Sequence, residues 1–217
     1  MNVLYEDNHL IVVCKPAGLL TQPNETSDDN LVDTVKAWIK IHHQKPGNVF
    51  LGVIHRLDRP VSGIVVFAKT SKALVRINDA MRSKKCKKTY VALIERTLPS
   101  SSGTLEHYLL HDDYRALISS KNNAKAKIAR LHYKILKKDS GTSLVEIDLE
   151  TGRYHQIRAQ MAASGCPIVG DVRYGSQTAL KNGFIALHHT RLEIEHPVKK
   201  TVMTFEAPSP DFLKLLI

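Results

Sequence analysis

Residues 55–68 read His-Arg-Leu-Asp-Arg-Pro-Val-Ser-Gly-Ile-Val-Val-Phe-Ala. The apolar run that closes this stretch predicts a buried strand, and the proline and glycine before it indicate a preceding loop. Asp58 lies in this loop between Arg56 and Arg59. Composition alone favours an exposed ion-pair cluster, because such pairs are common and contribute only about 0–1 kcal/mol. The functional alternative is a carboxylate that neighbouring cations keep ionised in a cleft.

Upstream of this stretch, the sequence predicts a hairpin followed by a helix. Residues 3–5 and 10–14 are β-prone and flank the turn-forming residues 6–9, which is typical of two paired strands. A helix is expected to begin at Asn30, with residues 28–30 as candidate N-caps. Its apolar side chains have the i, i+4, i+7, i+8 spacing of one helical face: Leu31, Val35, Trp38 and Ile39.

Downstream of the buried strand, a second helix is expected with Ser71 as its N-cap. Residues 89–94 return to a β-like composition, which predicts another strand. Residues 107–127 mix polar and basic side chains without sustained periodicity, so a long, mobile loop is expected there. The apolar face of the second helix has helical spacing: Leu74, Ile77 and Met81.

Alternating apolar and polar residues predict two half-buried strands, over residues 131–135 and 145–149. Asp-Ser-Gly at residues 139–141 supplies a turn, so the two strands are expected to pair antiparallel. A further helix is expected after Gly152 and should end at residues 164–165. This pattern indicates an α+β fold: a mixed, largely antiparallel β-sheet core with flanking helices and loops around a central catalytic cleft.

The composition is that of a folded protein with an excess of positive charge. The hydrophobic fraction is 43% and the charged fraction is 24% of 217 residues, so a single domain over residues 1–217 is expected. Lys and Arg number 31 against 21 Asp and Glu, which gives a formal net charge of +10. Nucleic acid is the commonest partner for such a chain, an anionic membrane surface is the second, and a solubilising charge is the plain alternative.

Several function classes are disfavoured. The chain has no apolar run of about 18 residues, and its N-terminal residues carry acid where a signal peptide carries base, so we expect a cytoplasmic protein without a membrane partner. Cys14, Cys86 and Cys166 lie far apart, which indicates reduced thiols. The histidine pairs at residues 42–43 and 188–189 lack metal-site spacing, and no glycine-rich phosphate loop occurs. Neither a metal nor a cofactor is expected.

The stretch around Asp58 resembles the central motif of RluA-type pseudouridine synthases, which is His-Arg-Leu-Asp followed by a Ser-Gly pair and a hydrophobic strand. The resemblance runs from about Leu4 to Phe205 and implies a short form of the family, without the N-terminal S4 RNA-binding domain of some relatives. Other segments match in the same order: residues 15–18 (Lys-Pro-Ala-Gly), 88–92 (Lys-Thr-Tyr-Val-Ala), 151–158 (Thr-Gly-Arg-Tyr-His-Gln-Ile-Arg), 165–171 (Gly-Cys-Pro-Ile-Val-Gly-Asp), 187–188 (Leu-His) and 196–197 (His-Pro).

The resemblance implies a reaction in which the N1–C1′ bond of uridine breaks, the base turns, and C5 bonds to C1′. It also implies that Asp58 is the single catalytic carboxylate and that Arg158 pairs with it, with Arg153 as the alternative partner. Tyr90 would line the uracil pocket and Leu187 would pack on the other side of the base. Without the resemblance, Tyr90 and Leu187 would be interpreted as core residues.

Folded RNA must present its uridine by base flipping, at a cost of a few kcal/mol. The resemblance implies that Arg56 fills the gap left by the base, with phosphate contact as the alternative. His55 and His155 belong to the matched motifs and either position neighbours or simply pack. Basic side chains before Tyr90 and in the expected loop predict an RNA-backbone track, with a solvated face as the alternative: Lys84, Lys85, Lys87, Lys88, Lys121, Lys125 and Lys127.

The expected function is therefore an RNA pseudouridine synthase that acts as a monomer on specific uridines in structured tRNA or rRNA. Relatives with the same motifs differ in target, so both RNAs stay open. One alternative is a protein that remodels RNA without chemistry and tolerates loss of Asp58. Another is a nucleoside hydrolase with Asp171 as the nearest second carboxylate, which would release the free base.

Overall fold

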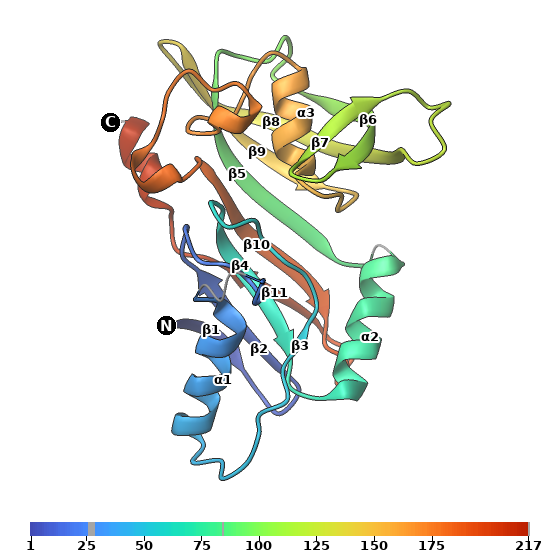
Figure 1. Cartoon of the computed structure of the whole chain (residues 1–217), viewed down its shortest axis with the longest axis vertical. Helices are drawn as coiled ribbons and strands as arrows, with labels where there is room; N and C mark the ends of the chain where they lie inside the picture. Colours follow the sequence, from blue (N-terminus) through green and yellow to red (C-terminus); the bar gives the residue numbers. More distant parts are fainter. Residues whose placement is uncertain (26–28, 84, 217) are drawn as a thin grey trace. The chain divides into compact units, whose positions relative to one another are not determined.

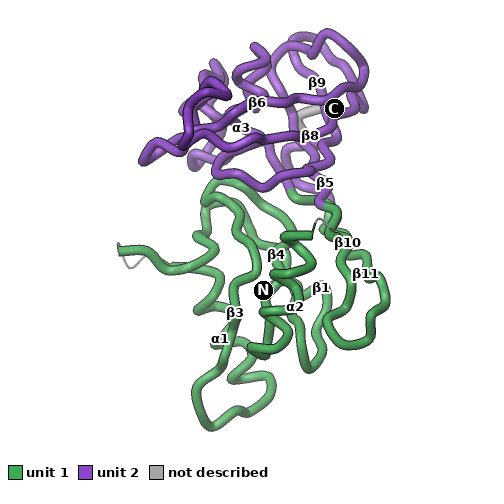
Figure 2. The backbone as a smooth tube through the Cα atoms, turned by 90° about the vertical axis from the view of Figure 1, so that its right-hand side faces the viewer, with its two compact units in different colours: residues 1–87, 189–208 green, residues 88–188, 209–217 purple. Residues whose placement is uncertain are grey.

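The computed structural model describes residues 1–25, 29–83 and 85–216 (Figure 1). The described residues form two compact units, coloured green and purple in Figure 2. Unit 1 consists of Met1–Lys87 and His189–Pro208. Unit 2 consists of Lys88–His188 and Ser209–Ile217. The chain therefore leaves unit 1, completes most of unit 2 and returns to unit 1.

The strands of unit 1 follow the order β1 (Asn2–Glu6), β2 (Leu10–Lys15), β4 (Ser62–Ala68) and β10 (Leu187–Glu195). The pairs β1–β2 and β2–β4 are antiparallel. Two further strands join antiparallel, with β3 (Gly52–Val53) on β4 and β11 (Val202–Glu206) on β10. The strand that follows the Asp58 loop is thus an interior strand of this unit.

Two helices belong to unit 1, and each buries one apolar stripe. The helix α2 (Ser71–Arg82) contributes Ala73 and Ile77 to a cluster of buried side chains from β2, β4, β10 and β11. The helix α1 (Leu31–His42) buries Leu31, Val35 and Ile39. Each fully buried aliphatic side chain stabilises the fold by about 1.5–3 kcal/mol. The strands β2 and β4 are buried on both faces, because consecutive residues along them have 0% exposure.

The strands of unit 2 follow the order β5 (Lys87–Glu95), β9 (Thr142–Leu149), β8 (Lys127–Asp139), β6 (Ser102–Asp112) and β7 (Arg115–Ser119). Every neighbouring pair in this order is antiparallel. The helix α3 (Gln156–Ala163) lies against β6 and β7. Its Ala159 packs with Leu109, Ala116 and Ala129 in a buried cluster. Short 3-10 helices follow at Val172–Tyr174, Lys181–Gly183 and Asp211–Leu216.

Most of the predicted elements are confirmed, and so is the α+β class. The hairpin is β1–β2, and the alternating strands are β8–β9 with a turn at Ser140 and Gly141. The first helix has Asn30 as its N-cap, whose side chain accepts a hydrogen bond from the Asp33 N–H. The candidate cap Asp28 lies outside the described residues. The N-cap of α2 is Thr70 rather than Ser71, which is the first helical residue.

The prediction of a long loop at residues 107–127 is wrong. The strand β6 continues to Asp112, β7 follows, and β8 begins at Lys127, so only residues 113–114 and 120–126 lie between strands. The hairpin has few fully buried side chains, because Leu109 and Ala116 alone among residues 107–119 are buried. Local alternation is therefore weak, and the strand state is stabilised by ladder hydrogen bonds to a neighbouring strand.

Among the residues described, no helix combines the length and the apolar content that crossing a lipid bilayer requires.

Candidate active site

The loop that carries Asp58 is tied to the segment that follows β2. The Gly18 N–H donates to the Arg59 carbonyl at 2.8 Å, and the Arg59 Nε donates back to the Gly18 carbonyl at 3.0 Å. The buried Thr21 hydroxyl donates to the Leu57 carbonyl at 2.8 Å and accepts from the Leu57 N–H at 3.1 Å. Hydrogen bonds to the backbone on both sides of Asp58 therefore hold the loop, and their partners lie in the Lys-Pro-Ala-Gly segment and its continuation.

The junction between this loop and β4 requires a glycine. Gly63 has a φ of +117°, and a Cβ at this position would lie 2.4 Å from the His189 carbonyl oxygen of β10. His189 in turn contacts the Ile64 carbonyl through its Nδ1 at 2.7 Å. Next to it, His55 Nε2 accepts from the Val66 N–H at 3.2 Å, so this nitrogen carries no proton. His55 thus contacts the backbone of β4 at Val66.

A buried lysine lies beneath the same loop. Lys15 has 0% exposure, and its Nζ donates to the carbonyls of Pro16, Leu19 and Arg59 at 2.9, 2.7 and 3.2 Å. Burial lowers the pKa of Lys15 to about 7, while the negative charge of Asp58 acts to raise it. Asp58 itself is half-buried. Lys15, which the sequence analysis named only as part of the Lys-Pro-Ala-Gly segment, therefore contacts the predicted catalytic loop.

In unit 2, Arg158 is held by a carboxylate. Arg158 on α3 is 4% exposed and Asp171 is 1% exposed. The Nε and Nη2 of Arg158 donate to the two Asp171 carboxylate oxygens at 2.7 and 2.9 Å, which is the strong bidentate geometry. The guanidinium carbon also lies 5.0 Å from the centre of the Tyr174 ring. The plane of the Arg158 guanidinium is therefore set within unit 2.

His155 and Tyr174 complete this arrangement. The Tyr174 hydroxyl accepts from the Ala116 N–H at 2.7 Å and lies 2.9 Å from His155 Nδ1. The tautomer of His155 decides which of these two groups donates the hydrogen bond. Burial, together with the charges of Arg158 and Arg173, lowers the pKa of His155 to about 3. A neutral His155 fits both observations.

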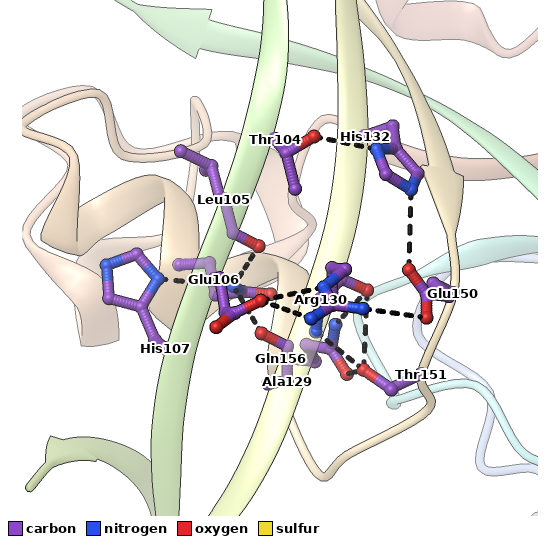
Figure 3. Close-up of polar contacts among 11 residues, drawn as sticks. Thr104, Leu105, Glu106, His107, Ala129, Arg130, His132, Glu150, Thr151 and Gln156 are labelled. Carbon is purple, nitrogen blue, oxygen red and sulfur yellow. Dashed lines mark hydrogen bonds and ion pairs between the residues drawn. The ribbon is translucent and has the colours of Figure 1, made fainter. Parts of the chain in front are cut away.

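The turn before α3 is fastened to β8 by a polar network centred on Arg130 (Figure 3). The Arg130 N–H donates to Thr151 Oγ1 at 2.8 Å, and Thr151 Oγ1 donates to Gln156 Oε1 at 2.8 Å. Gln156 Nε2 donates to the Arg130 carbonyl at 3.1 Å. The Arg130 guanidinium also pairs with Glu106 and Glu150 (Figure 3). This network sets where α3 begins and so where Arg158 lies in unit 2.

The remaining predicted residues fall into three groups. Tyr90 and Leu187 are buried, at 6% and 3% exposure. Arg56 is exposed, and Arg153 is exposed with its Nε on the Ile128 carbonyl at 3.0 Å. The basic side chains at residues 85, 87, 121, 125 and 127 are exposed and Lys88 is half-buried, whereas Lys84 lies outside the described residues.

The pairing of Asp58 with Arg158 stays a prediction, because Asp58 belongs to unit 1 and Arg158 to unit 2. Within unit 2 the carboxylate on Arg158 is Asp171. Both oxygens of Asp171 are engaged by this pair, which disfavours Asp171 as the second catalytic carboxylate of a hydrolase. In the sequence, the only sign of Asp171 as a partner for Arg158 was its place at the end of the matched segment, residues 165–171.

Comparisons with known proteins identify the wider group. Residues 9–163 match the family model described as RNA pseudouridylate synthase. The uncharacterized RNA pseudouridine synthase YhcT of Bacillus subtilis is 35% identical over 219 residues, which cover 100% of this chain and 71% of that protein. The ribosomal large subunit pseudouridine synthase D of Pseudomonas aeruginosa is 32% identical over 100% of this chain and 71% of its own length.

The fold also has a solved counterpart. The structure of human RNA pseudouridylate synthase domain containing 4 superimposes with a TM-score of 0.82, over 98% of this chain and 90% of that chain, at 22% identity. At this identity the likeness concerns the fold.

Proposed function

This chain belongs to the RNA pseudouridylate synthase family, and from that premise we propose that it isomerises specific uridines of large-subunit ribosomal RNA with Asp58 as its catalytic carboxylate. Support for the ribosomal target comes from the relative named ribosomal large subunit pseudouridine synthase D. The observation that supports Asp58 is its half-buried position in a loop whose backbone is hydrogen-bonded on both sides of it. We propose that both units form one catalytic domain, which acts in the cytoplasm as a monomer.

The reaction breaks the N1–C1′ bond of uridine and forms a C5–C1′ bond, while C5 loses a proton and N1 gains one. Nothing is oxidised and no water is consumed, so one carboxylate suffices where glycoside hydrolysis uses two. A fixed loop serves this chemistry, because the carboxylate must meet the nucleotide in one geometry while the base turns. The hydrogen bonds from the Gly18 N–H and the Thr21 hydroxyl limit the movement of the Asp58 loop.

We assign the other residues by the chemistry that their surroundings support. The oriented, permanently charged guanidinium of Arg158 would pair with the Asp58 carboxylate and keep it ionised. The Tyr90 ring offers a stacking face for uracil, with Leu187 on the other side of the base. Arg56 is exposed and would enter the stack when the uridine flips out.

The first prediction concerns Asp58→Asn. We expect pseudouridine formation in ribosomal RNA transcripts to fall below detection while RNA affinity changes less than about threefold, because the amide keeps the shape of the side chain and cannot act as a nucleophile or base. Pseudouridine can be counted by mass spectrometry of RNA digests, and affinity by filter binding. Asp79→Asn on α2 is the matched control, since Asp79 is an exposed carboxylate paired with Arg82, and it should keep full activity.

The same assay separates the alternatives. Full activity in Asp58→Asn would contradict the assignment of the carboxylate. A nucleoside hydrolase would release free uracil and leave abasic sites, whereas the synthase keeps every base attached. A protein that only remodels RNA would form no pseudouridine with the wild-type chain. Modification of transfer RNA alone would move the target to tRNA and leave the chemistry in place.

A further inference from the structure

Four aromatic side chains of unit 2 form a continuous series of ring contacts that begins at Arg158. The Arg158 guanidinium carbon lies 5.0 Å from the centre of the Tyr174 ring. The rings of Tyr174 and His155 meet edge to face with their centroids 5.6 Å apart. His155 stacks on Tyr154 at 3.9 Å with an interplanar angle of 17°, and His111 follows at 4.2 Å from Tyr154. The series therefore connects the predicted catalytic arginine to a ring near the end of β6.

The series of rings runs from the interior of unit 2 to its surface. His155 is buried, Tyr154 is half-buried and His111 is exposed. His111 shares a face of β6 with Leu109, two residues earlier, and Leu109 packs on Ala159 of α3. The outer two rings, His111 and Tyr154, therefore form an aromatic surface on the face of the sheet that α3 covers, and we call it the ring surface.

The ring surface is held in place by regular structure and by hydrogen bonds. His111 pairs with Ala116 in the β6–β7 ladder. The turn that carries Tyr154 is fastened by Gln156, whose Oε1 accepts from the Thr151 hydroxyl at 2.8 Å and from the residue 153 N–H at 3.0 Å. A ligand that stacks on rings fixed in this way immobilises few side chains, so little conformational entropy is lost on binding.

The charges near the ring surface are mixed. Arg153 and Arg173 are exposed, and each donates to a neutral backbone carbonyl, at 3.0 and 2.9 Å, so these contacts do not cancel their charge. The end of β6 and its turn also contain the exposed carboxylates Asp112 and Asp113, which offset it. The ligand should therefore be one that aromatic faces recognise. Unpaired nucleobases are such ligands, because every base has a π-face that stacks on aromatic side chains.

We propose that His111 and Tyr154 form a stacking site for an unpaired base of the substrate RNA, separate from the base that is isomerised. The inference rests on the proposed function, which identifies the ligand as RNA. No bond is made or broken at this site. A base stacked there holds the RNA on the part of unit 2 that carries Arg158. Because stacking tolerates any base, the site sets the position of the RNA rather than its sequence.

The second prediction tests the site with the double variant His111→Ala, Tyr154→Leu, in which leucine keeps an apolar contact with His155 and removes the ring. We expect the affinity for a large-subunit ribosomal RNA transcript to fall about 5- to 100-fold. The slope of log K against log salt should change by less than about 1, because a stacked base releases no counterions. Tyr154→Phe keeps the ring and should bind as wild type does. Filter binding at several salt concentrations measures both quantities.

Heparin is the matched probe, because it is a polyanion without bases. The double variant should bind heparin as tightly as wild type does. His132→Ala is the matched control variant: His132 is an exposed histidine on β8, and it lies on the opposite face of the sheet because it alternates with the buried residues Leu131 and Tyr133. It should keep the wild-type affinity for both RNA and heparin.

A loss of RNA affinity without a loss of heparin affinity supports the stacking site. Equal losses for RNA and heparin would overturn it. Wild-type RNA affinity in the double variant would also overturn it, and a lowered kcat beside that affinity would make the two rings packing partners of His155.

Two further arms keep the outcome decisive. If the double variant does not fold, His111→Ala is compared with His111→Phe, which keeps a ring, and equal RNA affinities of these two variants overturn the site. If the wild-type chain forms no pseudouridine, the proposed function fails, and the RNA and heparin affinities still decide the inference. A wild-type chain that binds no RNA overturns both.

Discussion

Arg158 and Asp171 show how a buried ion pair can serve function more than stability. Taking two charges out of water costs several kcal/mol per ion, and their attraction offsets this only with good geometry and further hydrogen bonds. Here the geometry is bidentate, at 2.7 and 2.9 Å, and Tyr174 covers the guanidinium. A hydrophobic pair could stabilise the helix equally well, so we infer that the benefit is a fixed guanidinium.

The third prediction follows from His155, whose pKa is lowered to about 3 by burial and by Arg158 and Arg173. The unfolded chain takes up this proton near pH 6.5 and the folded chain does so only near pH 3, so stability is lost as pH falls through this window. We expect His155→Asn to remove about 2 kcal/mol of the loss between about pH 7 and pH 5. Asparagine suits the φ of 48° at this position and can accept from Tyr174.

Urea unfolding of wild type and His155→Asn at both pH values measures the difference. His132→Asn on β8 is the control for the loss of a histidine at an exposed position, and its loss of stability between the two pH values should exceed that of His155→Asn. Identical pH dependence in His155→Asn and wild type would show that His155 titrates in the folded chain as it does in the unfolded chain.

At the scale of elements, β4 and β10 depend on one glycine. Gly63 lies where the Asp58 loop enters β4, and the backbone of His189 occupies the space that any Cβ would need. The Ser-Gly pair of the motif therefore has a steric cause, apart from any chemistry. By contrast, the hairpin β6–β7 has little buried area of its own, and its strands form because β8 offers a paired edge. The sequence motif therefore predicted the junction at Gly63 correctly, whereas periodicity was too weak to predict the β6–β7 hairpin.

The fourth prediction is that Gly63→Ala costs about 3 kcal/mol of unfolding free energy, because it combines a positive φ with a backbone clash. Gly141→Ala in the β8–β9 turn is the matched control. Gly141 has a φ of +81°, and a Cβ added there would meet nothing within 4 Å, so only the conformational cost of about 1 kcal/mol applies. Equal losses in the two variants, measured by denaturant unfolding, would refute the steric explanation.

At the scale of the whole molecule, the proposed reaction draws on residues from both units. Asp58 and Arg56 belong to unit 1, whereas Tyr90, Arg158 and Leu187 belong to unit 2. The strands β5 and β10 each contain residues of both units, so the chain passes between the units through regular structure. The formal net charge of +10 acts over the whole chain and favours association with a polyanion before any specific contact forms.

The fifth prediction separates a local RNA track from this general attraction. Replacing Lys84, Lys85, Lys87 and Lys88 with Gln should weaken RNA binding. The slope of log K against log salt should become shallower by about 3, because fewer counterions are released on binding when these phosphate contacts are lost. Filter binding at several salt concentrations measures the slope. The charge-matched control neutralises exposed lysines elsewhere: Lys134, Lys137, Lys138 and Lys199.

The control should change the slope by less than half as much. An equal change in both sets would assign the effect to net charge, and an unchanged slope in the first set would make that run a solvated face.

Several features can be read from the amino-acid sequence: the α+β class, the helices α1 to α3, the strand pairs β1–β2 and β8–β9, and the motif around Asp58. These features are local, because a helix or a half-buried strand repeats its apolar side chains at a fixed interval, and a motif is read from consecutive residues. The motif shows that residue 63 is a glycine, but the steric reason for it lies in the backbone of His189.

Which groups lie together, and which lose their hydration, depends on the folded chain. The burial of Lys15, the Asp171 partner of Arg158 and the neutral state of His155 depend on residues that are distant in sequence. Hydrogen bonding and desolvation act through space, so the same residue type is a solvated surface charge in one place and a positioning group in another. For that reason Asp58 could be identified from the sequence motif, whereas the hydrogen bonds of Lys15 and Thr21 to its loop are visible only in the fold.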